Sequence, residues 1–444
     1  MSTRPSFHIE TFGCQMNERD SEIMAQLLSE GARPCLDINE ADIVLVNTCS
    51  IREKAAHKAI SLLGQLRAEK GQRRRNPIVG VVGCLAQQEG QALLRRLPHV
   101  SLVIGPQNIY QLPALLAEAA QGRRLVAVDQ SSSFVIPPLA PQAGSGPPHK
   151  RFITIMQGCD NFCTYCVVPY TRGREISRDL DQVVAEARTL VEQGVKELIL
   201  LGQNVNSYGR KAKEGERRTF AELLRAVARL PGLERLRFTS SNPQDLTHEL
   251  LLAFAELPVL CPHFHLPVQS GSNRVLARMN RRYTRERYLE LIAELRSHRP
   301  GIAITTDLIV GFPGETEADF DLTCQLVTEV RYHGAFSFKY SDRPQAKAAG
   351  FADKVAEEVK ARRLSILQGL IDRMAWERNQ EFLGRTERVM VEGASPGGQA
   401  GQWQGRTGSS HLVHFVSPVA LAVGDLLDVR ITGAGQHSLR GELP

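Results

Sequence analysis

Apolar, strand-length segments alternate with helix-length segments through most of this sequence, and that order restricts the fold to α/β architectures with parallel strands. From 7 to about 125, strand patterns at 43–46 and 77–82 alternate with helical patterns at 20–30 and 53–69. We therefore predict an open α/β domain with a parallel sheet in this first part of the chain.

A segment unsuited to regular structure follows. Residues 131–150, SSSFVIPPLAPQAGSGPPHK, contain five Pro, four Ser and two Gly, a composition that favours a linker. Beyond it, strand patterns recur with helix-length segments between them, at 152–156, 197–201, 235–240, 262–266 and 304–310. This alternation predicts a full or partial (β/α) barrel, in which chemistry takes place at the carboxyl ends of the strands.

The last part of the chain has a different pattern. A helical stretch at 355–382 is followed by three strand patterns separated by Gly- and Ser-rich turns, at 388–392, 411–416 and 426–431. Strands without intervening helices predict a small antiparallel β-barrel. We accordingly expect a first domain, a linker, a barrel domain and a small β-barrel, with the boundaries 1–125, 126–150, 151–376 and 377–444.

Composition narrows the class of protein. The 444 residues suit two to four domains, and 54 Lys and Arg against 48 Asp and Glu permit nucleic-acid binding without requiring it. No apolar run has the length of a membrane span, and we find no signal-peptide pattern, so we expect a cytoplasmic protein that does not bind membranes. In a reducing compartment, nine cysteines are expected to serve metal binding or catalysis rather than disulfides.

Three cysteines of the second domain form the most specific motif. In GCDNFCTYC, Cys159, Cys163 and Cys166 have C-x3-C-x2-C spacing directly after the first strand pattern of that domain. Three thiolates can hold three irons of a [4Fe–4S] cluster and leave the fourth iron open to a small molecule. The alternatives are a zinc site completed by a distant ligand, or three core cysteines. The position at a strand end favours a reactive cluster.

Three further cysteines of the first domain lie about 35 residues apart, namely Cys14 in TFGCQMNERDS, Cys49 in VNTCSIREKA and Cys84 in VVGCLAQQEG. Each follows a strand pattern, so the three thiols could converge at one edge of a parallel sheet. Taken alone, each is more often a small buried hydrophobe than a ligand. Their strand-end positions, beside a domain with a cluster motif, favour a second three-cysteine cluster site.

Longer motifs carry a resemblance to known proteins. Roughly residues 150–375 resemble the radical S-adenosylmethionine (SAM) superfamily, whose members bind SAM at the open iron. Together, TFGCQMNERDSE, LVNTCSIREKA, GCDNFCTYCVVPYTRGRE, LLGQNVNSYG, FHLPVQSGSNRVL and DLIVGFPGET resemble the methylthiotransferases of the MiaB type. NTCSIREKA and GQNVNSYG are closer to the tRNA branch than to the branch that modifies a ribosomal protein. The resemblance extends from about Phe7 to Leu443.

This resemblance implies a ligand set. The SAM cluster would be held by Cys159, Cys163 and Cys166, and an auxiliary cluster by Cys14, Cys49 and Cys84. SAM would contact Tyr165 through its adenine and the segment Gly202, Gln203 and Asn204 through its amino group, with Gln269 and Asp307 as further cofactor contacts. Asn17 would contact the substrate. The segment at 202–204 is equally explained as a plain strand-to-helix turn, and Cys35, Cys261 and Cys324 are expected to serve packing.

The implied reaction adds a methylthio group at C2 of an N6-isopentenylated adenosine beside the anticodon of tRNA. An aromatic C–H bond is too inert for acid–base catalysis, so a cofactor radical must carry the step. On the family mechanism, the SAM cluster reduces SAM to release a 5′-deoxyadenosyl radical, and the auxiliary cluster supplies sulfur, which a second SAM methylates. We expect no essential side-chain acid or base. The implied partners are tRNA, an electron donor such as a flavodoxin or ferredoxin, and iron–sulfur assembly or sulfur-donor proteins.

The carboxyl-terminal part resembles a TRAM domain, a small β-barrel that binds RNA in this family. From Arg378 to Arg440 there are six Arg and five acidic residues, so the charge is nearly balanced and a protein-contact barrel is the alternative. Basic residues also gather at 73–75 and in RMNRRYTRER, where they are candidates for phosphate contacts only. In YSDRPQAKAAG, Gln345 and Lys347 replace the Gly and Pro of the family pattern. We expect this difference to affect the conformation of the loop and not the chemistry.

Two alternatives stay open. One is a methylthiotransferase that acts on a ribosomal protein or on another modified adenosine. The other is an RNA-binding protein whose clusters are structural or redox-sensing. Reductive cleavage of SAM separates these classes, because a purely structural cluster does not perform it.

Overall fold

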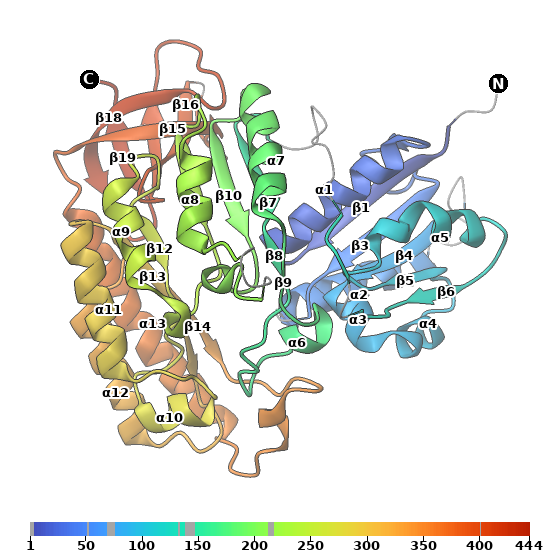
Figure 1. Ribbon diagram of the computed structural model, residues 1–444, viewed down its shortest axis with the longest axis horizontal. Coiled ribbons are helices and arrows are strands. Elements are labelled where there is room, and N and C mark those ends of the chain that lie inside the picture. Colours follow the sequence, from blue (N-terminus) through green and yellow to red (C-terminus); the bar gives the residue numbers. More distant parts are fainter. Residues whose placement is uncertain are drawn as a thin grey trace.

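The structure is a computed structural model that describes residues 4–50, 53–68, 76–131, 134–137, 147–211, 217–399 and 401–444. Within these ranges the chain forms an amino-terminal α/β domain, a central partial barrel and a carboxyl-terminal β-barrel (Figure 1). In the part of the chain that is described, no helix is both long enough and apolar enough to cross a membrane.

The amino-terminal domain is a six-stranded sheet with the order β2-β1-β3-β4-β5-β6, and all its neighbouring strands are parallel. In the central strand β3, Leu45 packs with α1 and α5, whereas Val44 and Val46 pack with α2 and α4. Helices on both faces explain why β3 is apolar over most of its length. The predicted open parallel domain is confirmed. Its elements are β1 (Ser6–Phe12), α1 (Gln15–Ser29), β2 (Arg33–Pro34), β3 (Ile43–Thr48), α2 (Glu53–Ala68), β4 (Ile78–Gly83), α3 (Cys84–Glu89), α4 (Gln91–Arg96), β5 (Leu102–Ile104), α5 (Leu112–Ala119) and β6 (Leu125–Ala127).

The central domain is a partial barrel of six parallel strands. Two three-stranded sheets, β11-β10-β7 and β12-β13-β14, are joined by one parallel bridge between Leu236 and Leu260. Helices cover the outside and bury the largest apolar cluster of the molecule against the strands (Figure 1). The prediction of a barrel is confirmed in its partial form. The strands are β7 (Lys150–Thr154), β10 (Glu197–Leu201), β11 (Arg235–Phe238), β12 (His263–His265), β13 (Ala303–Val310) and β14 (Gly334–Lys339), and the helices are α7 (Leu180–Glu192), α8 (Phe220–Ala228), α9 (His248–Glu256), α10 (Asn273–Arg278), α11 (Arg285–His298), α12 (Glu317–Val330) and α13 (Glu357–Gln380).

The inner face of this barrel differs from the face that meets the helices. On β13, Leu308 is buried in the main core, whereas Asp307 and Ile309 alternate with it on the inner face. The parallel register pairs Asp307 with Phe336 and Ile309 with Phe338, so both phenylalanines of β14 also face inward. Phe336 is 61% exposed and Phe338 is 45% exposed. The inner face therefore presents open apolar surface.

Five strands close the carboxyl-terminal barrel in the order β15-β16-β17-β19-β18. Four of the five neighbouring pairs are antiparallel. The fifth pair, β17 and β19, is parallel, because β19 returns from β18 in a hairpin and lies beside β17. The predicted small barrel is confirmed, with this one parallel pair. Its strands are β15 (Thr386–Ala394), β16 (Gln402–Thr407), β17 (Leu412–Val416), β18 (Leu426–Ala434) and β19 (Leu439–Glu442).

The carboxyl-terminal barrel is docked on the amino-terminal ends of the central strands. Arg235, the first residue of β11, donates hydrogen bonds to the backbone carbonyls of Arg388 and Arg406 at 2.8 Å each. Lys196, which precedes β10, donates to the carbonyl of Gly424 at 2.9 Å. The small barrel thus lies opposite the strand ends at which barrel enzymes perform their chemistry.

Two candidate iron–sulfur sites

The three cysteines of the amino-terminal domain meet at one edge of its sheet. Cys14 lies between β1 and α1, Cys49 follows β3, and Cys84 follows β4 and begins α3. Because β1, β3 and β4 are adjacent and parallel, their carboxyl ends lie side by side. The thiols of Cys14 and Cys49 are hydrogen-bonded, and Cys84 interacts electrostatically with Cys14. The structure therefore brings these three predicted ligands together.

Electrostatics at this site favour a thiolate on Cys14. A hydrogen bond from Cys49 is the main reason that the pKa of Cys14 is lowered to about 6; burial opposes this effect, and the positive charge of Arg172 adds to it. Burial raises the pKa of Cys84, although Arg172 acts in the opposite direction. Since the thiolate is the form that binds metals, Cys14 is ready to ligate at neutral pH.

Asn17 holds the Cys14 loop in place. Its Oδ1 accepts hydrogen bonds from the backbone nitrogen and the Sγ of Cys14, both at 3.4 Å. Its Nδ2 donates to Oδ1 of Asn47 at 3.0 Å, and Nδ2 of Asn47 donates to the Asn17 carbonyl at 2.8 Å. Asn17 is fully buried. The structure thus places this predicted substrate contact within the cysteine site.

The three cysteines of the C-x3-C-x2-C motif lie on the loop after β8 (Met156–Gln157). The backbone nitrogen of Cys166 donates to the Cys163 carbonyl at 2.9 Å. Burial is the main reason that the pKa of Cys159 and of Cys166 is raised to about 12, and the charge of Cys163 contributes to both shifts. Three thiolates that repel one another in a buried loop need a bound cation to stay together, and an iron–sulfur cluster supplies it. The donor set therefore fits a cluster.

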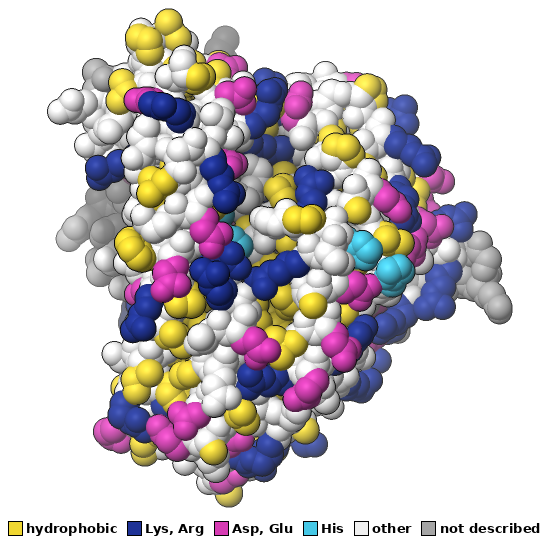
Figure 2. Space-filling view, turned by 90° about the vertical axis from the view of Figure 1, so that its left-hand side faces the viewer, with side chains coloured by type: hydrophobic (Ala, Val, Ile, Leu, Met, Phe, Trp, Pro, Cys, Tyr) yellow, Lys and Arg dark blue, Asp and Glu magenta, His cyan; other side chains and the backbone are white. Residues whose placement is uncertain are grey.

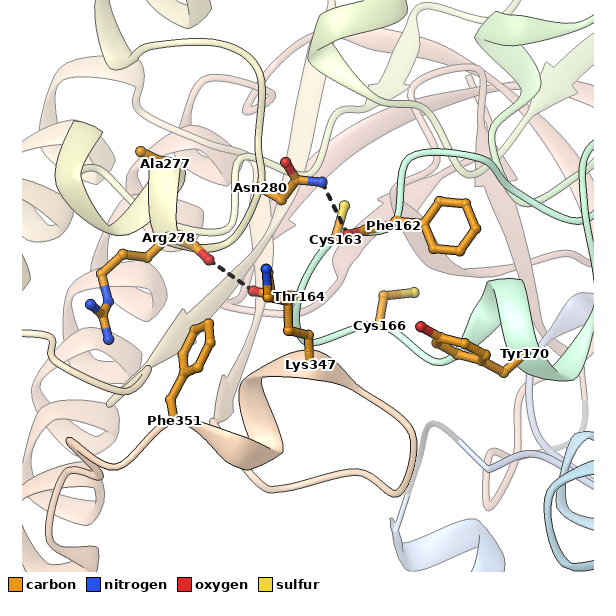
Figure 3. A pocket seen from close by; sticks show the side chains of 10 residues that line it. All are labelled: Phe162, Cys163, Thr164, Cys166, Tyr170, Ala277, Arg278, Asn280, Lys347 and Phe351. Atoms are coloured by element: carbon orange, nitrogen blue, oxygen red, sulfur yellow. Dashed lines mark hydrogen bonds between the residues drawn. The ribbon is translucent and has the colours of Figure 1, made fainter.

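A cavity of about 360 Å³ opens beside this loop (Figure 3). It is lined by two motif cysteines, three aromatic residues and two basic residues, among others: Cys163, Cys166, Phe162, Tyr170, Phe351, Arg278 and Lys347. Thr164 Oγ1 donates to the carbonyl of Arg278 at 2.9 Å, and Asn280 Nδ2 donates to the carbonyl of Phe162 at 3.1 Å, which fixes the wall. Aromatic rings and cations are the groups that bind the bases and phosphates of nucleotides.

Two of the residues predicted to bind SAM stand next to the cysteine loop. Gln203 Oε1 accepts a hydrogen bond from the backbone nitrogen of Gly158, the residue before Cys159, at 2.5 Å. Asn204 Nδ2 donates to Oδ2 of Asp245 at 2.7 Å. Gly202 precedes them, and a Cβ at this position would overlap the side chain of Met156. The segment 202–204 is therefore packed against the start of the cysteine loop and is not a freely exposed turn.

The other predicted SAM contacts gather on the inner face of the barrel. The backbone nitrogen of Gln269 donates to the Asp307 carbonyl at 2.9 Å. The Asp307 carboxylate lies 3.5 Å from Nε2 of His265. Tyr165, which precedes Cys166, packs in one apolar cluster with Ile309. The structure thus joins the cysteine loop to the inner face of β13.

Two buried arginines belong to these sites and were not predicted. Arg281 Nη1 donates to Sγ of Cys163 at 3.4 Å, and the positive charge of Arg172 acts on the thiol of Cys84. Arg281 belongs to the run RMNRRYTRER, whose basic residues were candidates for phosphate contacts, but its side chain is buried. The available signal for Arg172 was its place in VVPYTRGRE, directly after the cysteine motif.

The other arginines of that run are largely paired with carboxylates. Nη2 of Arg278 lies 2.7 Å from Asp353, and Nη2 of Arg285 lies 2.9 Å from Glu329. Basic and acidic side chains are interspersed over the face of the molecule that carries α11 and α13 (Figure 2). That face therefore offers no broad patch of one sign for RNA. The basic run at 73–75 lies outside the described residues.

The remaining cysteines lie in packed surroundings. Cys35 packs against the apolar cluster under α2, Cys324 packs against the main core, and Cys261 is buried. These positions fit the packing role expected of them.

Three family descriptions match the chain. They are the radical SAM superfamily over residues 153–327, the uncharacterized protein family UPF0004 over residues 6–105 and the TRAM domain over residues 380–443. The first covers the central barrel, the second the amino-terminal sheet and its three cysteines, and the third the small carboxyl-terminal barrel.

Curated proteins are similar over the whole length. A tRNA-2-methylthio-N(6)-dimethylallyladenosine synthase of Desulfotalea psychrophila is 50% identical, and the match covers 99% of this chain and 98% of that protein. The protein of the same name from Geobacter metallireducens is 51% identical over 100% of this chain and 99% of its own. That of Sphingopyxis alaskensis is 46% identical over 98% and 97%.

Solved structures share the fold at low identity. The radical S-adenosylmethionine methyltransferase TsrM from Kitasatospora setae, with tryptophan and a SAM analogue bound, has a TM-score of 0.57 and 15% identity, covering 89% of this chain and 79% of that one. The cobalamin-dependent radical enzyme OxsB has a TM-score of 0.51 and 14% identity, covering 83% and 56%. These likenesses support the barrel architecture alone.

Proposed function

This chain belongs to the family of tRNA-2-methylthio-N(6)-dimethylallyladenosine synthases, and we propose that its two three-cysteine sites bind two [4Fe–4S] clusters. The enzyme converts N6-isopentenyladenosine next to the anticodon of tRNA to the 2-methylthio derivative. Its radical SAM domain uses a [4Fe–4S] cluster and SAM. In addition, we propose the second cluster and the residues that serve each of the two clusters.

One observation carries the second cluster, namely the convergence of Cys14, Cys49 and Cys84 in a domain of their own. A cluster with four protein ligands is closed, whereas three thiolates leave one iron open. Methylthiolation needs one open iron for SAM and a second source for the sulfur. Two separate three-thiol sites meet both needs without a further ligand.

The residues around the sites bind and orient the reactants. When bound, the clusters and SAM supply the one-electron and sulfur chemistry that side chains lack. Gln203 and Asn204 present amides beside the cysteine loop to the amino-acid part of SAM, and Tyr165 supports its adenine. Gln269 and Asp307 shape the wall opposite the loop. Substrate contact by Asn17 stays a prediction.

We assign the prenylated adenosine to the inner face of β13 and β14. Phe336 and Phe338 expose their rings there, and a five-carbon prenyl group is an apolar partner for them. Asp307, paired across the strands with Phe336, offers a polar group for the base. The face begins at the cysteine loop, because Tyr165 packs with Ile309.

Anaerobic reconstitution tests the cluster assignment. We expect about eight irons in the wild-type protein, and about four when all three cysteines of either set are changed to Ala. The two sets serve as controls for each other. If the variant that lacks Cys159, Cys163 and Cys166 binds no iron while the chain stays folded, the independent amino-terminal site is wrong.

Further partners follow from the chemistry. Reductive SAM cleavage consumes an electron, so the proposal includes a donor such as a flavodoxin or ferredoxin. Each methylthio group removes sulfur from the auxiliary site, so an iron–sulfur assembly or sulfur-donor protein must restore it. With tRNA as the substrate, we place the enzyme in the cytoplasm. The proposed domains are 1–125, 151–376 and 377–444, with the linker at 126–150, and each family match falls inside one domain.

A further inference from the structure

A buried arginine of the central domain reaches into the cysteine site of the amino-terminal domain. Arg172 follows the short helix α6 (Val168–Thr171), which begins two residues after Cys166. Its Nη2 donates to Oδ2 of Asp20 in α1 at 2.7 Å, and the two side chains are 3% and 7% exposed. Helix α6 contacts α3, which begins at Cys84, and the positive charge of the guanidinium acts on the Cys84 thiol. Its Nη1 is buried without a hydrogen-bond partner among the described residues.

Backbone contacts fix the arginine in this position. The Arg172 carbonyl accepts from Nε2 of Gln157 at 3.4 Å, and the next carbonyl, that of Gly173, accepts from the backbone nitrogen of Cys159 at 3.3 Å. A Cβ on Gly173 would lie 2.9 Å from Nε2 of Gln107 in the amino-terminal domain. One short segment therefore connects the C-x3-C-x2-C loop with the other cysteine site.

The C-x3-C-x2-C loop has its own buried arginine. Arg281 donates to Sγ of Cys163 at 3.4 Å, to the hydroxyl of Tyr283 at 2.8 Å and to the carbonyl of Pro267 at 2.9 Å. Each three-cysteine site thus has one buried guanidinium whose positive charge acts on a ligand thiol. Arg172 differs in that a carboxylate, Asp20, shares its charge.

We propose that Arg172 is a positioning residue that raises the reduction potential of the auxiliary cluster through its buried positive charge, which its ion pair with Asp20 holds beside the site of Cys84. The inference rests on the proposed function, in which Cys14, Cys49 and Cys84 bind that cluster. A nearby cation and N–H···S hydrogen bonds stabilise the more negative, reduced state of a cluster. The unpartnered Nη1 is a buried donor in need of an acceptor, and a cluster sulfur is one.

The test reads the midpoint potential of the auxiliary cluster by redox titration followed by EPR. It uses full-length protein in which Cys159, Cys163 and Cys166 are Ala, so that only this cluster is present. Removing Arg172 alone would leave a buried carboxylate unpaired and strongly destabilise the fold. Asp20→Asn is therefore made first, and Arg172→Gln is added to it.

The two variants are expected to shift the potential in opposite directions. D20N raises the midpoint, because it removes a negative charge next to the site. Adding R172Q lowers the midpoint below that of D20N, because the buried cation beside Cys84 is lost. The comparison of these two variants isolates the arginine, since neither contains the carboxylate.

Arg281 provides the matched control. R281Q is expected to leave the auxiliary midpoint unchanged in the same background. In protein whose amino-terminal cysteines are Ala instead, R281Q is expected to lower the midpoint of the SAM cluster. A change of the auxiliary midpoint by R281Q would show that any buried arginine has this effect, and would overturn the specific assignment to Arg172.

Equal midpoints for D20N and D20N/R172Q, each with about four irons, would overturn the proposal. If the double variant holds no iron, D20N/R172M is titrated in its place, because methionine fills a similar space but carries no charge. A midpoint equal to that of D20N then overturns the proposal, and a lower one supports it. Absence of iron from the parent variant itself contradicts the proposed function instead, so the two failures are distinguishable.

Discussion

At the scale of single residues, one cysteine from each site separates the two proposed clusters. Cys163→Ala removes a thiolate from the site that binds SAM, so 5′-deoxyadenosine is expected to disappear. Cys49→Ala damages the sulfur-bearing site alone, so reductive SAM cleavage is expected to persist while methylthio transfer stops. Both products are measured by mass spectrometry. Wild-type levels of methylthio product from Cys49→Ala would contradict the assignment of two clusters.

Gln345 allows a second test at this scale. It occupies the place of a glycine in the family pattern and adopts a φ of +71°. Side chains make this left-handed conformation unfavourable by about 1–2 kcal/mol, and the greater freedom of glycine in the unfolded chain offsets about 0.4–1 kcal/mol of that. We expect Gln345→Gly to raise the melting temperature of the apoprotein slightly. Gln345→Ala, which keeps the Cβ, is expected to give no such rise, and an equal effect of the two would contradict the strain.

The cysteine ligands could be predicted from sequence, whereas their arginine partners could not. The cysteines carry local signals, because each set combines a short spacing or a strand end with a thiol. Arg172 and Asp20 are 152 positions apart, and Arg281 and Cys163 are 118 apart. Such pairs exist only once the domains are packed. The run of charged residues around Arg281 even favoured an exposed position for it, because a run of arginines does not indicate which of them is buried.

At the scale of elements, the order of strands and helices could be predicted wherever the periodic pattern of hydrophobic residues extended over enough positions. Helix α1 begins at Gln15, earlier than the predicted start at residue 20, because Cys14 and Asn17 form its cap. A cysteine is not among the usual capping residues, so the start carried no signal. Strands β5 and β6 have three residues each and were too short to show alternation.

Strand β14 carries a prediction about specificity. Phe336→Ala removes apolar surface from the inner face, and we expect weaker binding of an anticodon stem–loop RNA that contains the prenylated adenosine. A loss of about 1.4 kcal/mol of apolar burial corresponds to about a tenfold weaker Kd. Binding of the same RNA without the prenyl group is expected to change little. Phe336→Leu, which stays apolar, is the control, and an equal loss for both RNAs would contradict the assignment.

At the scale of the whole molecule, the small barrel allows RNA affinity to be separated from chemistry. Deleting residues 381–444 keeps α13 whole and removes no residue proposed to bind a cluster, SAM or the prenylated adenosine, since none of them lies beyond Phe338. We expect weaker tRNA binding and a flatter dependence on salt, with iron content and basal SAM cleavage retained. Each lost phosphate contact lowers the log–log slope by roughly 0.7–0.9. Unchanged affinity and slope in a folded, cluster-loaded truncation would assign the RNA surface to the central domain.

A double substitution controls for the contacts between the small barrel and the central domain that the truncation removes. Truncation uncovers Arg235, which is buried against the carbonyls of Arg388 and Arg406. Changing the exposed Arg388 and Arg440 to Gln keeps the barrel in place and removes two charges. If both arginines contact phosphates, the slope is expected to fall by roughly 1.4–1.8.

The attachment of the small barrel also fixes how far it lies from the opposite ends of the central strands. The small barrel, for which we predict RNA binding, is held by Arg235 and Lys196 at the starts of the strands, and the C-x3-C-x2-C loop lies at their ends. The longest strand between them, β13, has eight residues, about 25 Å of extended chain. If the small barrel binds RNA, a substrate must span this distance to be bound by the barrel and modified at the same time. We then expect the length of the stem, and not only the sequence of the anticodon loop, to decide which RNAs the enzyme modifies.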